Sequence, residues 1–468
     1  MRTLVWFRGK DLRVSDHGPL QAAVKGGEVI PVFVIDPYFF SPERAQELPH
    51  RMQFLLESLR SLAANLEHKG TRLICVEGKS TKVIPELAKE LNVDRVVAHR
   101  WVEPFGRKRD EIISQALHVP FDLFEGETLQ APGTLRTGKN TPFGVFTPFA
   151  KKFRNTCRID ATPSTPRKIP ALPKLPKLAQ VKIPSLEELG IETNPNIQDG
   201  GEKAAKARLK HFIAHAASHY HEDRDRMDKP GTSRLSADLK FGTLSVRTVW
   251  NAIEDALPEG EARRVYSNEL LWREFSHSTL WDRPELLDEP FKPAFKTFPW
   301  EFNDTLWEAW TSGHTGYPIV DAAARQLLHE GFVHNRARMI TASFLTKHLL
   351  IHYKRGEAHF MKYLTDGDWA QNNSGWQWSA GCGCDAQPYF RVFNPILQGK
   401  KFDPNGEYVR KYVPELRELP TKYIHSPWEA PDLILLGAKI KLGSVYPKPI
   451  VNHPEARKRF LATAKSAL

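Results

Sequence analysis

Short apolar runs alternate with helix-forming segments across the first 130 residues. The runs are rich in Val, Ile and Phe and lie at residues 2–8, 29–36, 71–78, 95–100 and 121–126. Residues 50–68 illustrate the segments between them, because Met52, Leu56 and Leu59 recur there at helical spacing. Strands that alternate with helices indicate a doubly wound parallel sheet, so the sequence predicts an α/β domain over residues 1–130. No G-x-G-x-x-G follows the first run, so a standard dinucleotide site is not indicated there.

The composition changes after this domain. Prolines at 163, 166, 170, 173, 176, 184 and 195 punctuate a Lys-rich stretch that cannot hold a helix. We therefore predict an interdomain linker over residues 131–200. Ten of the 12 tryptophans lie at or after Trp250, among segments of helical period, which predicts an all-α domain over residues 201–468.

The charge balance favours a polyanionic partner. The chain carries 66 Lys and Arg against 55 Asp and Glu, a net charge of +11, which suits nucleic acid, with a merely basic protein without such a partner as the less favoured alternative. Four cysteines are too few for a disulfide scaffold and favour a reducing compartment. Met1 is followed directly by a strand-like run with no leader pattern, and no apolar run is long enough for a membrane span. We predict a cytoplasmic protein.

Residues 366–378 read DGDWAQNNSGWQW and form the least ordinary run of the chain. Two Asn, a Ser and a Gly favour caps, turns and direct contacts over a helix interior. Contact with a bound ligand is the simplest interpretation.

Two further segments have both a functional and a structural interpretation. In GTSRLS, the side chains of Thr232, Ser233 and Ser236 can bind a phosphate at a helix start, or can simply cap that helix. In NELLWREF, Glu269 and Trp272 share one helical face, where a carboxylate beside an indole suits a planar heterocycle. A core tryptophan beside a structural ion pair remains the alternative for that second segment.

The segment HNRARMITASFL places Asn335, Arg338 and Met339 along one face of a predicted helix. Arg338 can pair with Asp366 or Asp368, whereas a methionine such as Met339 is by itself more typical of a core. Cys382 and Cys384 are too close in sequence for a zinc knuckle, and the 18 histidines lack ligand spacing, so we predict no metal site.

The ordered set of motifs GTSRLS, NELLWREF, GYPIVDAAARQL, HNRARMITASFL and DGDWAQNNSGWQW, behind an α/β domain and a Pro-rich linker, resembles the photolyase and cryptochrome flavoprotein family. The resemblance covers essentially the whole chain. HNRARM and NNSGWQW are similar to the segments of class I cyclobutane pyrimidine dimer photolyases.

This resemblance implies a light-dependent carbon–carbon lyase. Excited, fully reduced FAD in the helical domain would transfer an electron to a pyrimidine dimer flipped out of DNA. Extrusion is plausible because a dimer is already poorly paired. DNA containing pyrimidine dimers is the expected partner, and we expect a monomer without an obligate protein partner.

The resemblance also assigns residues to roles. The FAD-binding residues are expected to be Tyr220, Thr232, Ser233, Leu235, Ser236, Arg338, Asp366, Asp368 and Asn372. The catalytic residues are expected to be Glu269, Asn335, Met339 and Asn372, and the lesion-binding residues Trp272, Arg336 and Trp378.

The family's relay of electrons to resting flavin uses three tryptophans. Trp376 and Trp300 match the proximal and distal positions, but Tyr353 occupies the middle one. Because tyrosine is harder to oxidise unless it loses its proton, we hypothesise slowed or rerouted photoreduction, for example through Trp369.

A second, light-harvesting chromophore is also implied, but its identity is open. Folate-binding members carry Asn and Glu where this chain has Phe105 and Gly106 before the RKRD run, which disfavours folate. A deazaflavin, a second flavin and no antenna all remain open, with residues 41–51 as the expected lining.

A signalling cryptochrome is the main alternative function. Such proteins often carry a long C-terminal extension, whereas this sequence ends in a short basic helix-forming segment. The residues Glu269, Asn335, Met339 and Trp378 favour repair. A flavin-free DNA-binding protein is disfavoured by the amide-rich run at 366–378.

Overall fold

A five-stranded parallel sheet forms the N-terminal part of the protein, in a computed structural model that describes residues 1–176 and 178–468. The strands are β1 (Arg2–Phe7), β2 (Glu28–Ile35), β3 (Ile74–Glu77), β4 (Arg95–His99) and β5 (Phe121–Phe124), in the order β3-β2-β1-β4-β5. All four neighbouring pairs are parallel, and Val5 of the central β1 lies opposite Pro31 and Val97. The predicted α/β class is therefore confirmed. The prediction of a strand over 71–78 was too long, because pairing with β2 begins only at Ile74.

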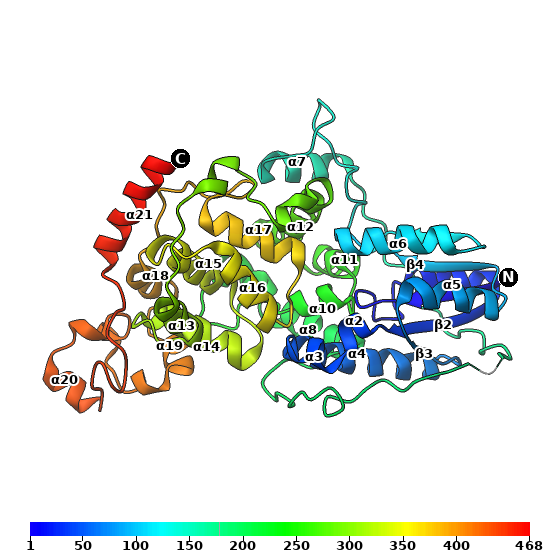
Figure 1. The fold of residues 1–468 in the computed structure, drawn as a ribbon, viewed down its shortest axis with the longest axis horizontal. Coiled ribbons are helices and arrows are strands. Elements are labelled where there is room, and N and C mark those ends of the chain that lie inside the picture. Colours follow the sequence, from blue (N-terminus) through cyan, green and yellow to red (C-terminus); the bar gives the residue numbers. More distant parts are fainter. Residues whose placement is uncertain (177) are drawn as a thin grey trace. The chain divides into compact units, whose positions relative to one another are not determined.

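Helices pack on both faces of this sheet (Figure 1). The main ones are α1 (Gly18–Gly26), α4 (Pro49–His68), α5 (Ser80–Glu90) and α6 (Pro104–Ala116). One apolar core contains Leu56 and Leu59 of α4, and a second contains Ile84 of α5. The helical spacing read in residues 50–68 thus corresponds to the buried face of α4.

The chain divides into two compact units, which are described separately. Unit 1 comprises Met1–Ser218 and Ser233–Pro284, and unit 2 comprises His219–Thr232 and Glu285–Leu468. Residues 233–284 belong with the sheet because Ala237 and Phe241 take part in the core that contains α4. The predicted division at residues 130 and 200 remains a prediction.

The rest of unit 1 is helical or irregular. Its further helices are α2 (Pro37–Phe40), α3 (Pro42–Gln46), α7 (Phe146–Thr156), α8 (Glu202–His215), η1 (Ala217–His219, whose last residue is assigned to unit 2), α10 (Ser236–Phe241), α11 (Val246–Ala256) and α12 (Glu261–Asp282). The described part of residues 157–201 contains no helix, in keeping with the proline spacing.

Unit 2 is built from helices. The α-helices are α9 (Tyr220–Asp223), α13 (Asp304–Ser312), α14 (Pro318–Glu330), α15 (Asn335–Ser343), α16 (Tyr353–Tyr363), α17 (Trp369–Ala380), α18 (Pro395–Phe402), α19 (Glu407–Tyr412), α20 (Asp432–Gly437) and α21 (His453–Ala467). A π-helical turn, η4 (Phe344–His348), follows α15 directly. Short 3-10 turns are η2 (Pro284–Leu287, whose first residue is assigned to unit 1), η3 (Pro293–Thr297), η5 (Pro414–Leu416), η6 (Thr421–Tyr423) and η7 (Pro427–Glu429). Among the described residues, none of the helices has the length and apolar character needed to cross a bilayer.

Candidate functional site

Helices α15 and α17 of unit 2 pack against each other and carry seven of the predicted site residues. Each begins at a side-chain cap. His334 accepts the amide N–H of Arg336 before α15, and Asp368 accepts the N–H of Gln371 before α17. From α15 come Asn335, Arg336, Arg338 and Met339, and from α17 come Asn372, Trp376 and Trp378.

Arg338 is held in place by two contacts. One guanidinium nitrogen donates to Asp366 Oδ2 at 2.7 Å, and Nε donates to the carbonyl oxygen of Val333 at 2.8 Å. The predicted pairing of Arg338 is therefore realised with Asp366, while Asp368 caps α17 instead. The other carboxylate oxygen of Asp366 is buried and accepts no hydrogen bond from the described residues. Such an acceptor suits a polar heterocycle with N–H groups, so this surface fits the flavin that the sequence predicts.

The amide side chains of α17 divide into two groups. Asn373 Nδ2 donates to the carbonyl oxygen of Leu286 at 2.8 Å, and Gln377 Nε2 donates to the same oxygen at 3.1 Å. These two amides hold the backbone before α13, so ligand contact does not explain the whole amide-rich run. Asn372 Nδ2 donates to the carbonyl oxygen of Glu357 at 3.0 Å, which fixes the amide and leaves Oδ1 as an acceptor.

The lesion-side residues of α15 are placed differently from one another. Arg336 pairs with Asp225 at 2.8 Å and lies over the ring of Phe402. Asn335 is exposed, and Met339 is half-buried and lies outside the apolar core. Met339 is not part of the apolar core, which argues against its interpretation as a core residue. Trp378 of α17 is also half-buried.

In unit 1, α12 presents Glu269 and Trp272, both half-buried, on one face. The ring of Phe146 at the start of α7 stacks on Trp272, with centroids 3.8 Å apart and planes at 6°. Phe146 was not predicted as a site residue, and its signal in the sequence is its place in an aromatic-rich run.

The structural ion pair next to Trp272 involves other residues than Glu269. Glu274 accepts the amide N–H of Leu129 at 2.9 Å, and Arg273 donates to the carbonyl oxygen of Glu127 at 2.6 Å. Arg273 and Glu274 also lie 3.6 Å apart and are buried. Arg273 and Glu274 thus form the structural ion pair that the alternative interpretation expected beside Trp272.

The GTSRLS segment precedes the short helix α10. Leu235 occupies the cap position without a side-chain cap bond, so the interpretation of this segment as an ordinary cap is not realised. Ser233 Oγ accepts the hydroxyl of Tyr266 at 3.1 Å, and Leu235 is buried. Thr232 and Ser236 are half-buried, while Tyr220 is buried in unit 2.

The predicted relay residues lie in one aromatic region of unit 2. Trp376 is buried, and the rings of Tyr353 and Trp300 are 6.3 Å apart. The Tyr353 hydroxyl is buried and has no hydrogen-bond partner among the described residues, and burial raises its pKa. Oxidation of Tyr353 therefore lacks a nearby acceptor for the phenolic proton.

A second tryptophan path starts at Trp376. The rings of Trp376 and Trp310 are 6.0 Å apart edge to face, and Trp310 stacks on the half-buried Trp307 at 5.5 Å. Trp369 is 41% exposed and makes no ring contact within the described chain. The hypothesised detour through Trp369 is therefore less well supported than this second path.

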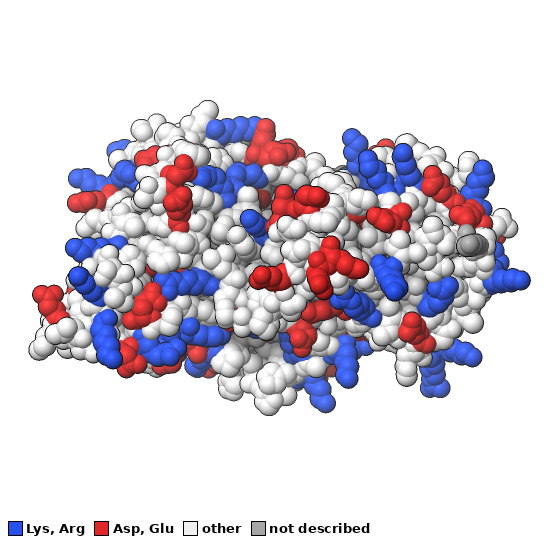
Figure 2. Space-filling view, turned by 60° about the horizontal axis from the view of Figure 1, so that its bottom comes forward, with Lys and Arg blue, Asp and Glu red and all other residues white. Residues whose placement is uncertain are grey.

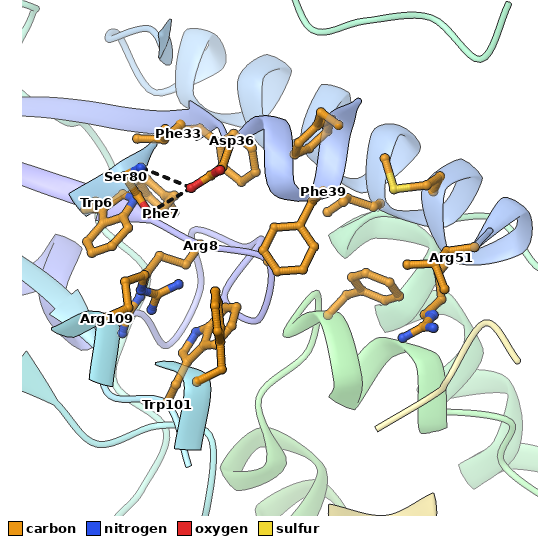
Figure 3. A pocket seen from close by; sticks show the side chains of 18 of the residues that line it. Trp6, Phe7, Arg8, Phe33, Asp36, Phe39, Arg51, Ser80, Trp101 and Arg109 are labelled. Carbon is orange, nitrogen blue, oxygen red and sulfur yellow. Dashed lines mark hydrogen bonds between the residues drawn. The ribbon is translucent and has the colours of Figure 1, made fainter. Parts of the chain in front are cut away.

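Unit 1 also contains a cavity of about 130 Å³ at the carboxyl ends of β1 and β2 (Figure 3). Its labelled lining residues are Trp6, Phe7, Arg8, Phe33, Asp36, Phe39, Arg51, Ser80, Trp101 and Arg109. Arg109 lies 4.4 Å from the ring centre of Trp101 and 4.8 Å from that of Trp6. Arg8 pairs with Asp110 at 2.6 Å, but its Nε and second terminal nitrogen are buried without hydrogen-bond partners among the described residues.

The mouth of this cavity is aromatic. Phe105, the residue that disfavours folate, stacks on Tyr38 with centroids 5.1 Å apart, and both side chains are about half exposed. Leu48 and Arg51 come from the segment 41–51 that the sequence predicts as lining. Ligands of parallel sheets bind at this edge, so a flat molecule with an anionic or acceptor group fits here.

A buried cluster of Asp11, His17 and His99 also has the spacing of metal ligands. Asp11 Oδ2 lies 3.3 Å from His99 Nδ1 and 3.5 Å from His17 Nε2. His17 Nδ1, however, accepts the amide N–H of Leu20, so the proton of the neutral ring is on Nε2. Burial lowers the pKa of His99 to about 3, which keeps that ring neutral as well. Because a protonated Nε2 cannot bind a metal, this cluster is a structural network.

Two family models match the sequence. The one described as "DNA photolyase" matches residues 3–173, and the one described as "FAD binding domain of DNA photolyase" matches residues 266–466. A curated protein named deoxyribodipyrimidine photo-lyase, from Agrobacterium fabrum, is 41% identical and covers 98% of this chain and 96% of its own length.

Solved structures of similar proteins share the fold. A class III photolyase from Agrobacterium tumefaciens superposes with a TM-score of 0.93 at 40% identity, covering 100% of this chain and 97% of its own. A Synechocystis cryptochrome gives 0.91 at 32% identity, covering 99% and 98%. An archaeal photolyase from Sulfolobus tokodaii, solved with two FAD molecules, gives 0.84 at 29% identity and covers 100% of both chains.

Proposed function

The chain belongs to the DNA photolyase family, and on that premise we propose that it is a deoxyribodipyrimidine photo-lyase that repairs cyclobutane pyrimidine dimers in DNA under blue light. The observation that carries the proposal is the α15–α17 surface, where Arg338, Asp366 and Asn372 present fixed polar atoms. The similarity of HNRARM to class I members stays a prediction, since a 40% identical structure is of a class III photolyase.

The protein binds FAD, and Arg338, Asp366 and Asn372 are the residues we assign to its ring system. When bound and reduced, FAD supplies the electron that light transfers to the lesion. Asn372 Oδ1 is an acceptor for a ring N–H, since its amide nitrogen is already bonded to the Glu357 carbonyl. Tyr220, Thr232, Ser233, Leu235 and Ser236, with Asp368, are the remaining residues we assign to the cofactor.

We assign the lesion to the aromatic and polar residues of α12, α15 and α17. Trp272, supported from behind by Phe146, offers a flat face for an extruded base, and Glu269 offers a carboxylate for a thymine edge. Asn335, Arg336, Met339 and Trp378 complete this set.

For photoreduction of the resting enzyme, we propose that electrons reach Trp376 mainly through Trp310 and Trp307. The alternative through Tyr353 and Trp300 requires loss of a phenolic proton for which no acceptor lies within hydrogen-bond distance among the described residues. Repair starts from reduced FAD, so it does not depend on either route.

The unit 1 cavity is the proposed site of a second chromophore. Arg8 and Arg109 beside Trp6 and Trp101 suit a flat, anionic ring. Phe105→Ala removes an exposed aromatic ring at the opening of the cavity and leaves the apolar core intact. We expect the purified variant to lose any second chromophore band while its FAD absorbance stays unchanged.

The partner we propose is DNA containing pyrimidine dimers, with the protein acting as a cytoplasmic monomer. A signalling receptor is the second candidate, because a cryptochrome shares the fold at a TM-score of 0.91. The two functions differ in one assay. The reduced holoprotein is illuminated with an oligonucleotide containing a thymine dimer, and restored thymines are counted. No restoration above a dark control would contradict repair and favour signalling.

A further inference from the structure

Residues 128–159 carry basic side chains and no acidic one. The basic residues are Arg136, Lys139, Lys151, Lys152, Arg154 and Arg158. The chain as a whole has nearly balanced charges, 66 against 55, so an acid-free stretch of this length concentrates much of its net charge of +11. On the face drawn in Figure 2, by contrast, Lys and Arg are interspersed with Asp and Glu. We call residues 131–145 together with α7 the basic finger.

The loop of the basic finger projects from unit 1 beside α7 (Figure 1), yet hydrogen bonds hold its tip. Thr137 N–H donates to the carbonyl oxygen of Thr141 at 3.0 Å, and the two hydroxyls are 2.7 Å apart. Arg136 makes two bonds to the Asp282 carboxylate, at 2.6 and 2.8 Å. The loop therefore presents Lys139 from a defined turn.

An open hollow of about 510 Å³ lies between this loop and α7. Its lining residues are Arg136, Thr137, Gly138, Phe143, Gly144, Val145, Pro148, Lys151, Lys152 and Asn155. Lys139, Lys151 and Lys152 are exposed, and no carboxylate of the described residues forms an ion pair with any of them. The hollow thus combines cations lacking counter-ions with a hydroxyl and an amide that can bond phosphate oxygens.

We propose that the basic finger binds the phosphate backbone of DNA beside the lesion. This inference rests on the proposed function and names the surface that positions its substrate. Exposed cations without acidic neighbours can bind the phosphates of a polyanion, and this binding releases the counter-ions of those phosphates. The same helix α7 begins with Phe146, which stacks on Trp272. Phosphates held along α7 would therefore fix the register of the DNA relative to that indole.

The test compares two variants of the full-length holoprotein with equal charge changes. Lys151→Gln with Lys152→Gln removes cations from the hollow, and Lys82→Gln with Lys89→Gln removes two exposed cations from α5. The dissociation constant for a dimer-containing duplex is measured over a range of salt concentrations. We expect the slope of log affinity against log salt to fall by about 1.8 for the first pair, because each contact contributes about 0.9. We expect almost no change for the second.

Equal slopes for the two variants would overturn the proposal. Repair is measured separately on the unaltered protein, as thymines restored per absorbed photon. If the unaltered protein restores no thymine, the proposed function fails. The slope comparison, repeated on an undamaged duplex, would still decide whether the basic finger binds DNA.

Discussion

The indole of Trp310 lies edge to face against that of Trp376, with ring centroids 6.0 Å apart and planes at 71°. Trp307 stacks on Trp310 with ring centroids 5.5 Å apart and is partly exposed. These three rings connect the buried end of the relay to the solvent without a residue that must lose a proton.

Replacing Trp310 with Phe should slow photoreduction of oxidised FAD severalfold, because phenylalanine is not oxidised at these potentials. Tyr353→Phe, in contrast, should have little effect, since the hydroxyl of Tyr353 has no hydrogen-bond partner among the described residues. The rate is followed as bleaching of flavin absorbance under blue light with an external reductant. A Tyr353→Phe variant slower than Trp310→Phe would assign the main route to Tyr353.

Phe146 is expected to matter for lesion binding although it was not predicted as a site residue. Phe146→Ala removes the ring stacked on Trp272, which should weaken dimer binding about tenfold, the equivalent of a stacking contact of roughly 1–1.5 kcal/mol. Phe146→Leu keeps most of the volume and serves as the control for packing. Dimer-containing and undamaged duplexes are compared by fluorescence anisotropy. Equal loss on both duplexes would mean that Phe146 supports general DNA binding only.

Asp366→Asn should lower the FAD content of the purified protein. The substitution removes the charge that holds Arg338 at 2.7 Å, and a charge-assisted bond of this kind contributes about 1.5–3 kcal/mol. Flavin absorbance relative to protein absorbance measures the effect. Asp304→Asn, which alters only an exposed pair with Arg355, is the matched control and should retain its flavin. Full flavin content in both variants would argue against a role for Asp366 in binding.

Stability should depend on pH through Asp403. Burial raises the pKa of this carboxyl from 3.8 to about 6, although it accepts the N–H groups of Tyr408 and Val409. Between these two values the folded protein binds more protons than the unfolded chain, so stability falls as pH rises from about 4 to 6. The shift corresponds to about 3 kcal/mol.

Asp403→Asn cannot ionise and should lose this part of the pH dependence. The midpoint of thermal unfolding at pH 4 and pH 7 should therefore differ less in the variant than in the unaltered protein. The exposed Asp432→Asn provides a control whose pH dependence should stay unchanged. An identical pH dependence in all three proteins would remove Asp403 as the cause.

The sheet could be predicted from the sequence because its strands are short apolar runs that alternate with helices of clear period, and β1 to β4 are largely buried. Residues 71–73 were included in β3 on composition, but pairing with β2 decides where that strand begins. The pairing of Arg338 with Asp366 could be anticipated because the two side chains carry opposite charges. An arginine in one motif and a carboxylate in another have few other partners for an ion pair.

Other parts of the site depend on contacts that no local pattern encodes. Asn372, Asn373 and Gln377 are similar in the sequence, yet two of them bond the Leu286 carbonyl and only Asn372 retains an acceptor. Phe146 and Trp272 are distant in the chain and meet only through the packing of α7 on α12. Trp310 belongs to a motif-free helix, so its contact with Trp376 was visible only in three dimensions.

The interleaved order of the two units has a consequence for biosynthesis. The core around α4 includes Ala237 and Phe241. The apolar side chains of α4 therefore stay incompletely packed until residues about 170 positions later have left the ribosome. At typical translation rates of about 5–20 residues per second, that delay lasts roughly ten to thirty seconds. Nascent chains of this length should therefore be clients of chaperones, and truncations that end before residue 241 should aggregate.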